Sequence, residues 1–190
     1  DKGVDREVLS IRDMKSPSEK LQLAAVKKNP TAIEYIRNPT EKVMLEAIRQ
    51  NGDLVQYLKN VPENVKLEAV KDYGEAIRWM DDPSEEIQLA AIAQDPVAVR
   101  CIYKPTLNVQ LAAVRTSGAV IEFLDDPSEE VQLEAVKEWA GAIEFIKNPT
   151  EVVQLAAVSK SGLVIKSLSS PSVKVQKAAI RQNPNSVRNI

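Results

Sequence analysis

Residues 127–137 read Pro-Ser-Glu-Glu-Val-Gln-Leu-Glu-Ala-Val-Lys, and related versions of this stretch recur every 22 residues. The recurrence runs from residue 17 to the end of the chain without insertion or deletion. Its alanine occupies one column in every repeat: Ala25, Ala47, Ala69, Ala91, Ala113, Ala135, Ala157 and Ala179. The residue after each of these alanines is always Val or Ile. A fixed short period of this kind predicts an array of structural repeats.

Each repeat reads as two helices. The first is expected to begin at a boundary such as Asn38-Pro39-Thr40-Glu41, with Asn or Asp as the N-cap, proline at the first helical position and Glu reaching back to the cap. It is expected to end near pairs such as Asn51-Gly52, where glycine favours a left-handed C-terminal cap. A second segment of about two turns follows, for example residues 31–36, and is expected to be partly 3₁₀.

The apolar columns of one repeat cover about half the circumference of its first helix, which is more than two helices can bury by themselves. The alanine column allows neighbouring helices to approach closely, since a larger side chain would push them apart. The sequence therefore predicts an all-α solenoid, an α-α superhelix of about eight 22-residue two-helix repeats, forming one domain over residues 17–190. Residues 1–16 read as a partial repeat or an N-terminal cap, with Ile11 and Met14 in the apolar columns.

Residues 20–30, Lys-Leu-Gln-Leu-Ala-Ala-Val-Lys-Lys-Asn-Pro, resemble the leucine-rich repeat variant and, more loosely, HEAT-like solenoids. This resemblance extends over residues 17–190 and implies a curved, right-handed superhelix used mainly for binding. The repeat is shorter than that family's usual unit, and Gln replaces the expected Arg after the branched aliphatic residue. The chain also lacks the cysteine cluster that would hold an iron–sulfur appendage.

Composition narrows the possible function classes. The chain of 190 residues is 44% hydrophobic with a formal net charge of -2, so it has no overall attraction to polyanions. It has no histidine, and its one cysteine, Cys101, has no histidine partner and cannot form an internal disulfide. No apolar run is long enough to span a bilayer. We therefore expect a soluble, cytoplasmic protein that is not an enzyme and has no cofactor or metal.

A basic column lies near the end of the first helices, on the side expected to be exposed. Repeated at the spacing of packed helices, about 10 Å, it would form a stripe able to contact a nucleic-acid backbone or an acidic partner. The alternative is that these cations complement the helix dipole. The column consists of Lys27, Arg49, Lys71, Arg115, Lys137 and Arg181.

Two further columns and one acidic motif favour structural roles. The aromatic column is expected to pack at the edge of the second helix, partly exposed, and consists of Tyr35, Tyr57, Trp79, Cys101, Phe123 and Phe145. The glutamine column is expected to bond the turn backbone of the adjacent repeat, and consists of Gln22, Gln88, Gln110, Gln132, Gln154 and Gln176. The acidic motif of residues 81–86, repeated at 125–130, reads as helix capping and not as a cation site.

The repeat starting at Pro83 breaks its columns most often, which makes it a candidate binding site. The residues expected to contact a partner are Arg100, Tyr103, Lys104 and Leu107, together with Trp139 at a turn position that other repeats fill with smaller polar residues or Tyr73.

The leading hypothesis is a non-catalytic scaffold that binds a protein or peptide. It depends on a column of mixed charge that differs between repeats and suits a specific, shaped partner: Glu34, Gln56, Arg78, Arg100, Glu122, Glu144, Lys166 and Arg188. Nucleic-acid binding through the basic column and a spacer within a longer array are the alternatives.

Overall fold

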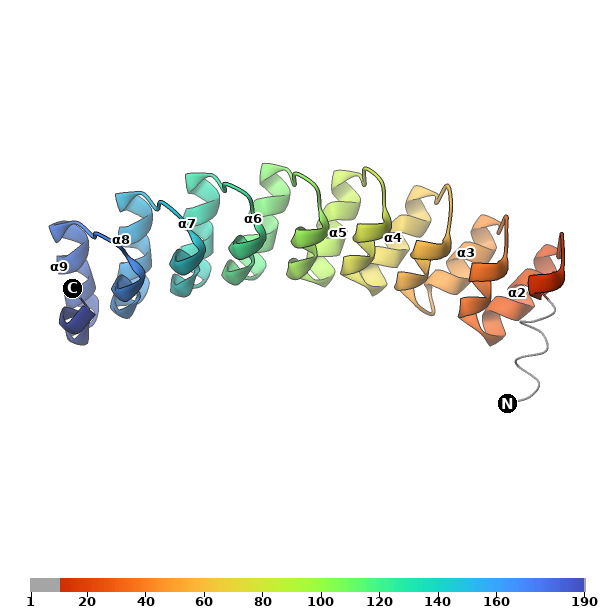
Figure 1. The fold of residues 1–190 in the computed structure, drawn as a ribbon, viewed down its shortest axis with the longest axis horizontal. Coiled ribbons are helices and arrows are strands. Elements are labelled where there is room, and N and C mark those ends of the chain that lie inside the picture. Colours follow the sequence, from red (N-terminus) through yellow and green to blue (C-terminus); the bar gives the residue numbers. More distant parts are fainter. Residues whose placement is uncertain (1–10, 190) are drawn as a thin grey trace. The chain divides into compact units, whose positions relative to one another are not determined.

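The computed structural model describes residues 11–189 and is helical throughout its regular part, with no strand among those residues. α-Helices alternate with six-residue 3₁₀ helices, designated η (Figure 1). The all-helical prediction is therefore confirmed, and the second segment of each repeat is 3₁₀ over its whole length. The chain divides into two compact units at Ile102 and Tyr103. The prediction that residues 17–190 form one domain stays a prediction.

The first unit contains α2 (Glu19–Lys28), η1 (Pro30–Tyr35), α3 (Glu41–Ile48), η2 (Gly52–Tyr57), α4 (Glu63–Asp72), η3 (Gly74–Trp79), α5 (Glu85–Gln94) and η4 (Pro96–Cys101). Successive α-helices pack on one another and successive 3₁₀ helices do the same, so the unit has two layers. Of the two apolar residues noted before residue 17, Ile11 is buried and Met14 is exposed. The rest of the predicted N-terminal partial repeat, residues 1–10, lies outside the described residues.

The second unit repeats this arrangement with α6 (Leu107–Thr116), η5 (Gly118–Phe123), α7 (Glu129–Glu138), η6 (Ala140–Phe145), α8 (Glu151–Lys160), η7 (Gly162–Ser167), α9 (Val173–Gln182) and η8 (Pro184–Asn189). Here too the α-helices pack on each other in sequence, as do the 3₁₀ helices. In both units the repeats therefore bury their apolar faces against their neighbours, as the period predicts.

The alanine column lies in the core of each unit, where its members have between 0% and 4% of their surface exposed. The Val or Ile that follows each alanine is buried in every repeat except the last, where Ile180 is partly exposed. The 3₁₀ helices add residues such as Ile77 and Ile143. Since these side chains are small or branched, neighbouring repeats pack closely with few rotamers to order.

The helix starts differ from the expectation. The α-helices begin one residue after the N-caps Ser18, Thr40, Pro62, Ser84, Thr106, Ser128, Thr150 and Ser172. The cap follows the proline in seven repeats, and in α4 the proline, Pro62, is itself the cap. The expected caps Asn38 and Asp82 belong to the preceding turn. The following glutamate, such as Glu41, is then the first helical residue, where its charge complements the helix dipole.

The residue expected to cap these helices has a different role in four turns, where it adopts a left-handed conformation. These residues are Asn60, Asp82, Lys104 and Asp126, with φ between 45° and 50°. Asn and Asp tolerate this region because their short side chains bond locally, whereas lysine has no such compensation.

We expect Lys104→Asn to stabilise the protein by roughly 0.5–1 kcal/mol, because it relieves the left-handed strain of a non-glycine residue. Thermal unfolding followed by circular dichroism measures the change. Lys147→Asn is the control, since Lys147 does not have a positive φ. An equal gain in both variants would show that removal of a charge, and not the backbone, is responsible.

The glycines at the ends of the α-helices also differ from the expectation. None of the described glycines has a positive φ, so the predicted left-handed glycine cap is wrong. These glycines are required by a close approach between repeats. A Cβ atom on Gly74 would lie 2.6 Å from the carbonyl oxygen of Ala91 in the next α-helix. Gly52, Gly118 and Gly162 face Ala69, Ala135 and Ala179 in the same way.

Each of these glycines also donates its amide to a side chain that lies 20 residues later, at the end of the next α-helix. The acceptor oxygens are Asp72 Oδ2 for Gly52, Gln94 Oε1 for Gly74, Glu138 Oε2 for Gly118 and Gln182 Oε1 for Gly162, at 2.5–2.7 Å. The bond joins two repeats at one fixed position. It therefore sets the register of the stack.

The glutamine column does not join repeats as expected. Gln88 Nε2 donates to the carbonyl oxygen of Pro83 at 2.9 Å, within its own repeat. Gln22, Gln110, Gln132, Gln154 and Gln176 make the same bond to the proline five residues earlier. The expectation of a bond to the adjacent repeat was wrong, because the side chain folds back over the first turn of its own helix.

Candidate functional site

The 3₁₀ helices present two exposed columns. The mixed-charge column, hereafter the variable column, is exposed in all eight repeats. The next residue belongs to the aromatic column, in which Tyr57 is 44% exposed, Trp79 49%, and Phe123 and Phe145 39% each. The two residues before the variable position, such as Ala76 and Ile77, are buried in η1 to η7, whereas Val187 of η8 is 59% exposed. Because a 3₁₀ helix has about three residues per turn, one side of each helix is buried and the opposite side faces solvent.

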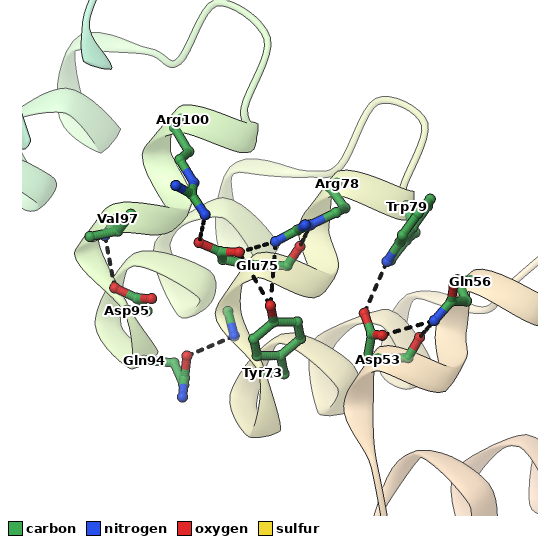
Figure 2. A network of polar contacts seen from close by, with 11 residues as sticks. Asp53, Gln56, Tyr73, Glu75, Arg78, Trp79, Gln94, Asp95, Val97 and Arg100 are labelled. Carbon is green, nitrogen blue, oxygen red and sulfur yellow. Dashed lines mark hydrogen bonds and ion pairs between the residues drawn. The ribbon is translucent and has the colours of Figure 1, made fainter. Parts of the chain in front are cut away.

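The most developed polar cluster on this surface surrounds Glu75 of η3 (Figure 2). This glutamate is only 8% exposed. Its Oε2 atom accepts a hydrogen bond from Tyr73 Oη at 3.2 Å and forms an ion pair with Arg78 Nη2. Its Oε1 atom accepts from Arg100 Nη2 of η4 at 2.5 Å. Burial of a carboxylate is tolerated because all these donors surround it.

Two members of the variable column, Arg78 and Arg100, are therefore held by one carboxylate. Arg78 Nε also donates to the backbone oxygen of Glu75 at 2.9 Å, which fixes its guanidinium in a second direction. The two arginine side chains remain 37% and 48% exposed. We refer to Arg78 and Arg100 as the arginine pair. With one buried carboxylate between two cations, the cluster has an excess of one positive charge.

Trp79 lies next to the arginine pair and is also held across repeats. Its indole Nε1 donates to Asp53 Oδ1 of η2 at 3.0 Å, and Asp53 Oδ2 accepts from Gln56 Nε2 at 2.8 Å (Figure 2). A ring that is half exposed yet hydrogen-bonded is oriented before any partner arrives. This orientation lowers the entropy cost of using the ring as an anchor.

An open cavity of about 460 Å³ adjoins Trp79 in the same unit. The indole lines it together with Met80 and the ammonium-bearing side chains of Lys59 and Lys66. Lys66 is also paired with Glu63 at 2.7 Å. Asn60 and Asp81 line it too, so the cavity combines charged groups of both signs with the apolar surface of Leu58, Val61 and the Trp79 ring.

The predicted contact residues lie in different parts of the chain. Arg100 belongs to the first unit and is part of the Glu75 cluster. In the second unit, Tyr103 is 86% exposed, with the Lys104 ammonium 5.2 Å from its ring centroid, and Leu107 is 48% exposed at the start of α6. Trp139 is 43% exposed and lies against Phe145, with ring centroids 6.2 Å apart. That these residues contact a partner stays a prediction.

The residues of the basic column are all exposed, as expected; five lie on the α-helices and Arg49 is the C-cap of α3. Half of them, however, bind glutamates: Arg49 pairs with Glu68 at 3.4 Å, and Arg115 and Lys137 pair with Glu134 at 2.9 and 2.8 Å. The Arg49 and Arg115 pairs join successive repeats. The column therefore forms ion pairs within each unit in addition to any effect on the helix dipole.

We expect the pairing of Glu134 to appear in its titration. Hydrogen bonds from Lys137 and then Arg115 hold the pKa of the Glu134 carboxyl below its ordinary value of 4.5. Because the folded-state pKa is the lower one, the contribution of Glu134 to stability is present above its unfolded pKa and is lost as pH falls through the folded pKa. Carboxyl-resolved NMR should show a low midpoint that rises in Arg115→Gln. An unchanged midpoint in that variant would contradict the pairing.

The acidic motifs do not assemble a metal centre. Among the described residues, no group of three or more Cys, Asp or Glu side chains could hold a metal ion. Glu85 and Glu86 lie in the first turn of α5, and Glu129 and Glu130 lie in the first turn of α7, as capping predicts. Cys101 is a free thiol of partial exposure in η4.

Sequence reasoning placed Arg78 and Arg100 in a common column but missed Glu75 between them. A signal was available: Glu75 and Asp53 are the only carboxylates at a position that other repeats fill with Thr31, Val97, Ala119, Gly141, Leu163 and Asn185. The hydrogen bonds of the glycine amides also had a signal in the sequence. Each glycine is followed 20 residues later by a side chain with an acceptor oxygen, at Gly52, Gly74, Gly118 and Gly162.

No family model, curated protein or solved structure matches this chain. Within the described part of the chain, none of the helices combines the length and the apolar character needed to cross a bilayer.

Proposed function

We propose that the protein is a non-catalytic scaffold that binds a protein or peptide along its 3₁₀ helices. The observation that supports this function most strongly is the contrast within each of these helices. In η1 to η7 two residues are buried and nearly constant in type, and the next two are exposed or partly exposed and change from repeat to repeat. In η8 only the first of the two, Ser186, is buried. A constant core with a changing surface is the arrangement that repeat proteins use to bind shaped partners.

The chemistry of the exposed columns favours a protein partner. Aromatic residues are the most common binding anchors in protein interfaces. In the first unit Tyr57 and Trp79 accompany Gln56, Arg78 and Arg100, whereas in the second unit Phe123 and Phe145 accompany Glu122 and Glu144. With Glu34 in the first unit and Lys166 and Arg188 in the second, the variable column has mixed charge in both units, which suits a sequence-specific partner better than a uniform polymer.

We also propose that the repeats form a right-handed superhelix. The resemblance to the leucine-rich repeat variant and to HEAT-like solenoids implies a right-handed superhelix, and the repeat-on-repeat packing within each unit agrees with it. A solenoid of this kind would align the variable and aromatic columns into a long surface for an extended segment.

Nucleic-acid binding is the second candidate, supported by the exposure of the basic column. It is the weaker one, because Glu68 and Glu134 bind Arg49, Arg115 and Lys137 and place carboxylates beside the cations. A polyanion would have to displace or face these carboxylates. Binding to labelled single-stranded and duplex DNA that falls steeply with salt would favour this candidate over the first.

Selection of a random peptide library on the immobilised full chain tests the proposed function. We expect peptides to be recovered and their affinity to fall about tenfold or more in Trp79→Ala or Phe145→Ala. Val152→Ala is the control, because Val152 is 55% exposed but belongs to α8 and not to a 3₁₀ helix. If no peptide is recovered, or if the control weakens binding equally, the proposed surface is wrong.

A further inference from the structure

We propose that the arginine pair binds an acidic side chain of the peptide, next to an apolar residue of the same peptide that contacts Trp79. This inference rests on the proposed function and adds the chemical class of the ligand. It concerns the first unit alone, where Arg78, Arg100 and Trp79 lie on η3 and η4.

The inference depends on N–H groups of the arginine pair that make no hydrogen bond with the described residues. A guanidinium has five N–H groups. Arg78 uses Nε and Nη2 on Glu75 and Tyr73, and Arg100 uses only Nη2, on Glu75. Arg78 Nη1 and Arg100 Nε and Nη1 make no hydrogen bond with the described residues. The cluster thus holds two oriented guanidiniums with unused donors at a surface where the side chains are 37% and 48% exposed.

Planar guanidinium donors match the two oxygens of a carboxylate, and such charge-assisted bonds are about twice as strong as neutral ones. Glu75 already neutralises one of the two arginines, so a second carboxylate would complete the charge balance of the cluster. Glu75 and Tyr73 also fix the guanidiniums before binding, so less side-chain entropy is lost when the ligand arrives.

The neighbouring groups favour a peptide over a nucleic acid. Figure 2 shows Arg78 and Arg100 meeting at the Glu75 carboxylate from two helices, with Trp79 beside Arg78 and its indole bonded to the Asp53 carboxylate. These carboxylates would repel the continuous charge of a phosphate backbone, and the whole chain has a net charge of -2. A single acidic side chain brings one charge to the arginine pair in place of a continuous row, and the cavity lined in part by Leu58, Trp79 and Met80 offers apolar surface to its neighbour.

The test is a random peptide selection on the full chain, repeated on the double variant Arg78→Gln/Arg100→Gln. We expect peptides from the unmodified chain to be enriched in Asp or Glu beside an aromatic or large aliphatic residue. The best of them, made synthetically, should bind the double variant about tenfold more weakly or worse. Arg100→Lys keeps the charge but loses the planar donors. Its affinity for the peptide should lie between those of the unmodified chain and the double variant.

The matched control is Arg49→Gln/Arg115→Gln, which removes the same charge from the α-helices and also breaks two ion pairs with glutamates. We expect it to leave affinity for the acidic peptide unchanged. Circular dichroism melting of every variant verifies folding. If the double variant melts at room temperature, the single variant Arg100→Gln takes its place, since Arg100 makes only one bond to Glu75.

Three outcomes would overturn the inference. Recovered peptides without acidic enrichment, or with equal affinity for both double variants, would refute the acidic ligand and leave the peptide-binding function standing. Failure to recover any peptide would refute both. Single-stranded DNA that competes with the acidic peptide and depends on Arg78 and Arg100 would assign the arginine pair to nucleic acid instead.

Discussion

Gly118→Ala is expected to destabilise the protein by roughly 2–4 kcal/mol, because the new methyl group collides with the next repeat. Its Cβ would lie 2.8 Å from Glu138 Oε2 and 3.1 Å from the Trp139 nitrogen, and it would overlap the carbonyl oxygen of Ala135. Backbone atoms of α7 cannot move aside without opening the contact between the two repeats. The same shift would stretch the bond from the Gly118 amide to Glu138.

Gly141→Ala is the matched control in the same unit. The three atoms nearest to a methyl group there all belong to the ring of Trp139, which is 43% exposed and can rotate toward solvent. We expect a cost of about 1 kcal/mol or less, offset in part by the lower entropy of the unfolded alanine chain. Urea unfolding of both variants measures the difference. Equal destabilisation would mean that lost glycine flexibility, and not the approach of the next repeat, governs both sites.

Ala91→Leu is expected to destabilise the protein by roughly 3 kcal/mol, since a leucine at this position must be accommodated in a space that now holds one methyl group. Ala91 is 0% exposed on α5, and its carbonyl oxygen lies against Gly74 of the preceding repeat. The added volume would push α4 and α5 apart. It would also weaken the Gly74 to Gln94 bond that sets their register.

Ala90→Leu is the control for this substitution on the same helix. Ala90 is partly exposed, and other repeats carry Glu46, Glu68 and Glu134 at its position, so a larger side chain already fits there. We expect its effect to stay within about 0.5 kcal/mol. A thermal melt compares the two variants. A large loss in Ala90→Leu, or none in Ala91→Leu, would contradict the close packing of the alanine column.

The stacking contacts and the proposed binding surface use different residues. Register depends on glycine amides, alanine carbonyls and acceptors such as Gln94, all at the ends of the α-helices. The arginine pair and Trp79 lie on the 3₁₀ helices and are exposed. Substitution of Trp79 should therefore change binding with little loss of stability. Substitution of Arg78 or Arg100 should also lower stability, because it removes a partner of the buried Glu75 carboxylate.

The repeat, its length and its core could be predicted from the sequence. Hydrophobic periodicity and small-residue columns follow directly from the residue types. They recur eight times here, so that local exceptions such as Val61 do not obscure them. The second helix was expected to be short and partly 3₁₀, and the aromatic column partly exposed. Both expectations are confirmed.

The helix starts were misjudged because two residues competed for one role. Asn38 and Thr40 are both good N-caps, and only the folded turn shows that Thr40 holds this position. The glycines were assigned to left-handed caps for a similar reason, since a sequence does not show whether a glycine is needed for its backbone angles or for the space around it.

The sequence by itself determined that this chain is a stack of short helical repeats around columns of alanine and branched residues, because each repeat encodes its own amphipathic pattern. Only the tertiary structure decided which side chains of different repeats meet. The Gly74 amide meets Gln94, 20 residues on, and Glu75 meets Arg100, 25 residues on. Such pairs depend on the spacing and rotation of one repeat on the next, which arise from packing and are not encoded in any local motif.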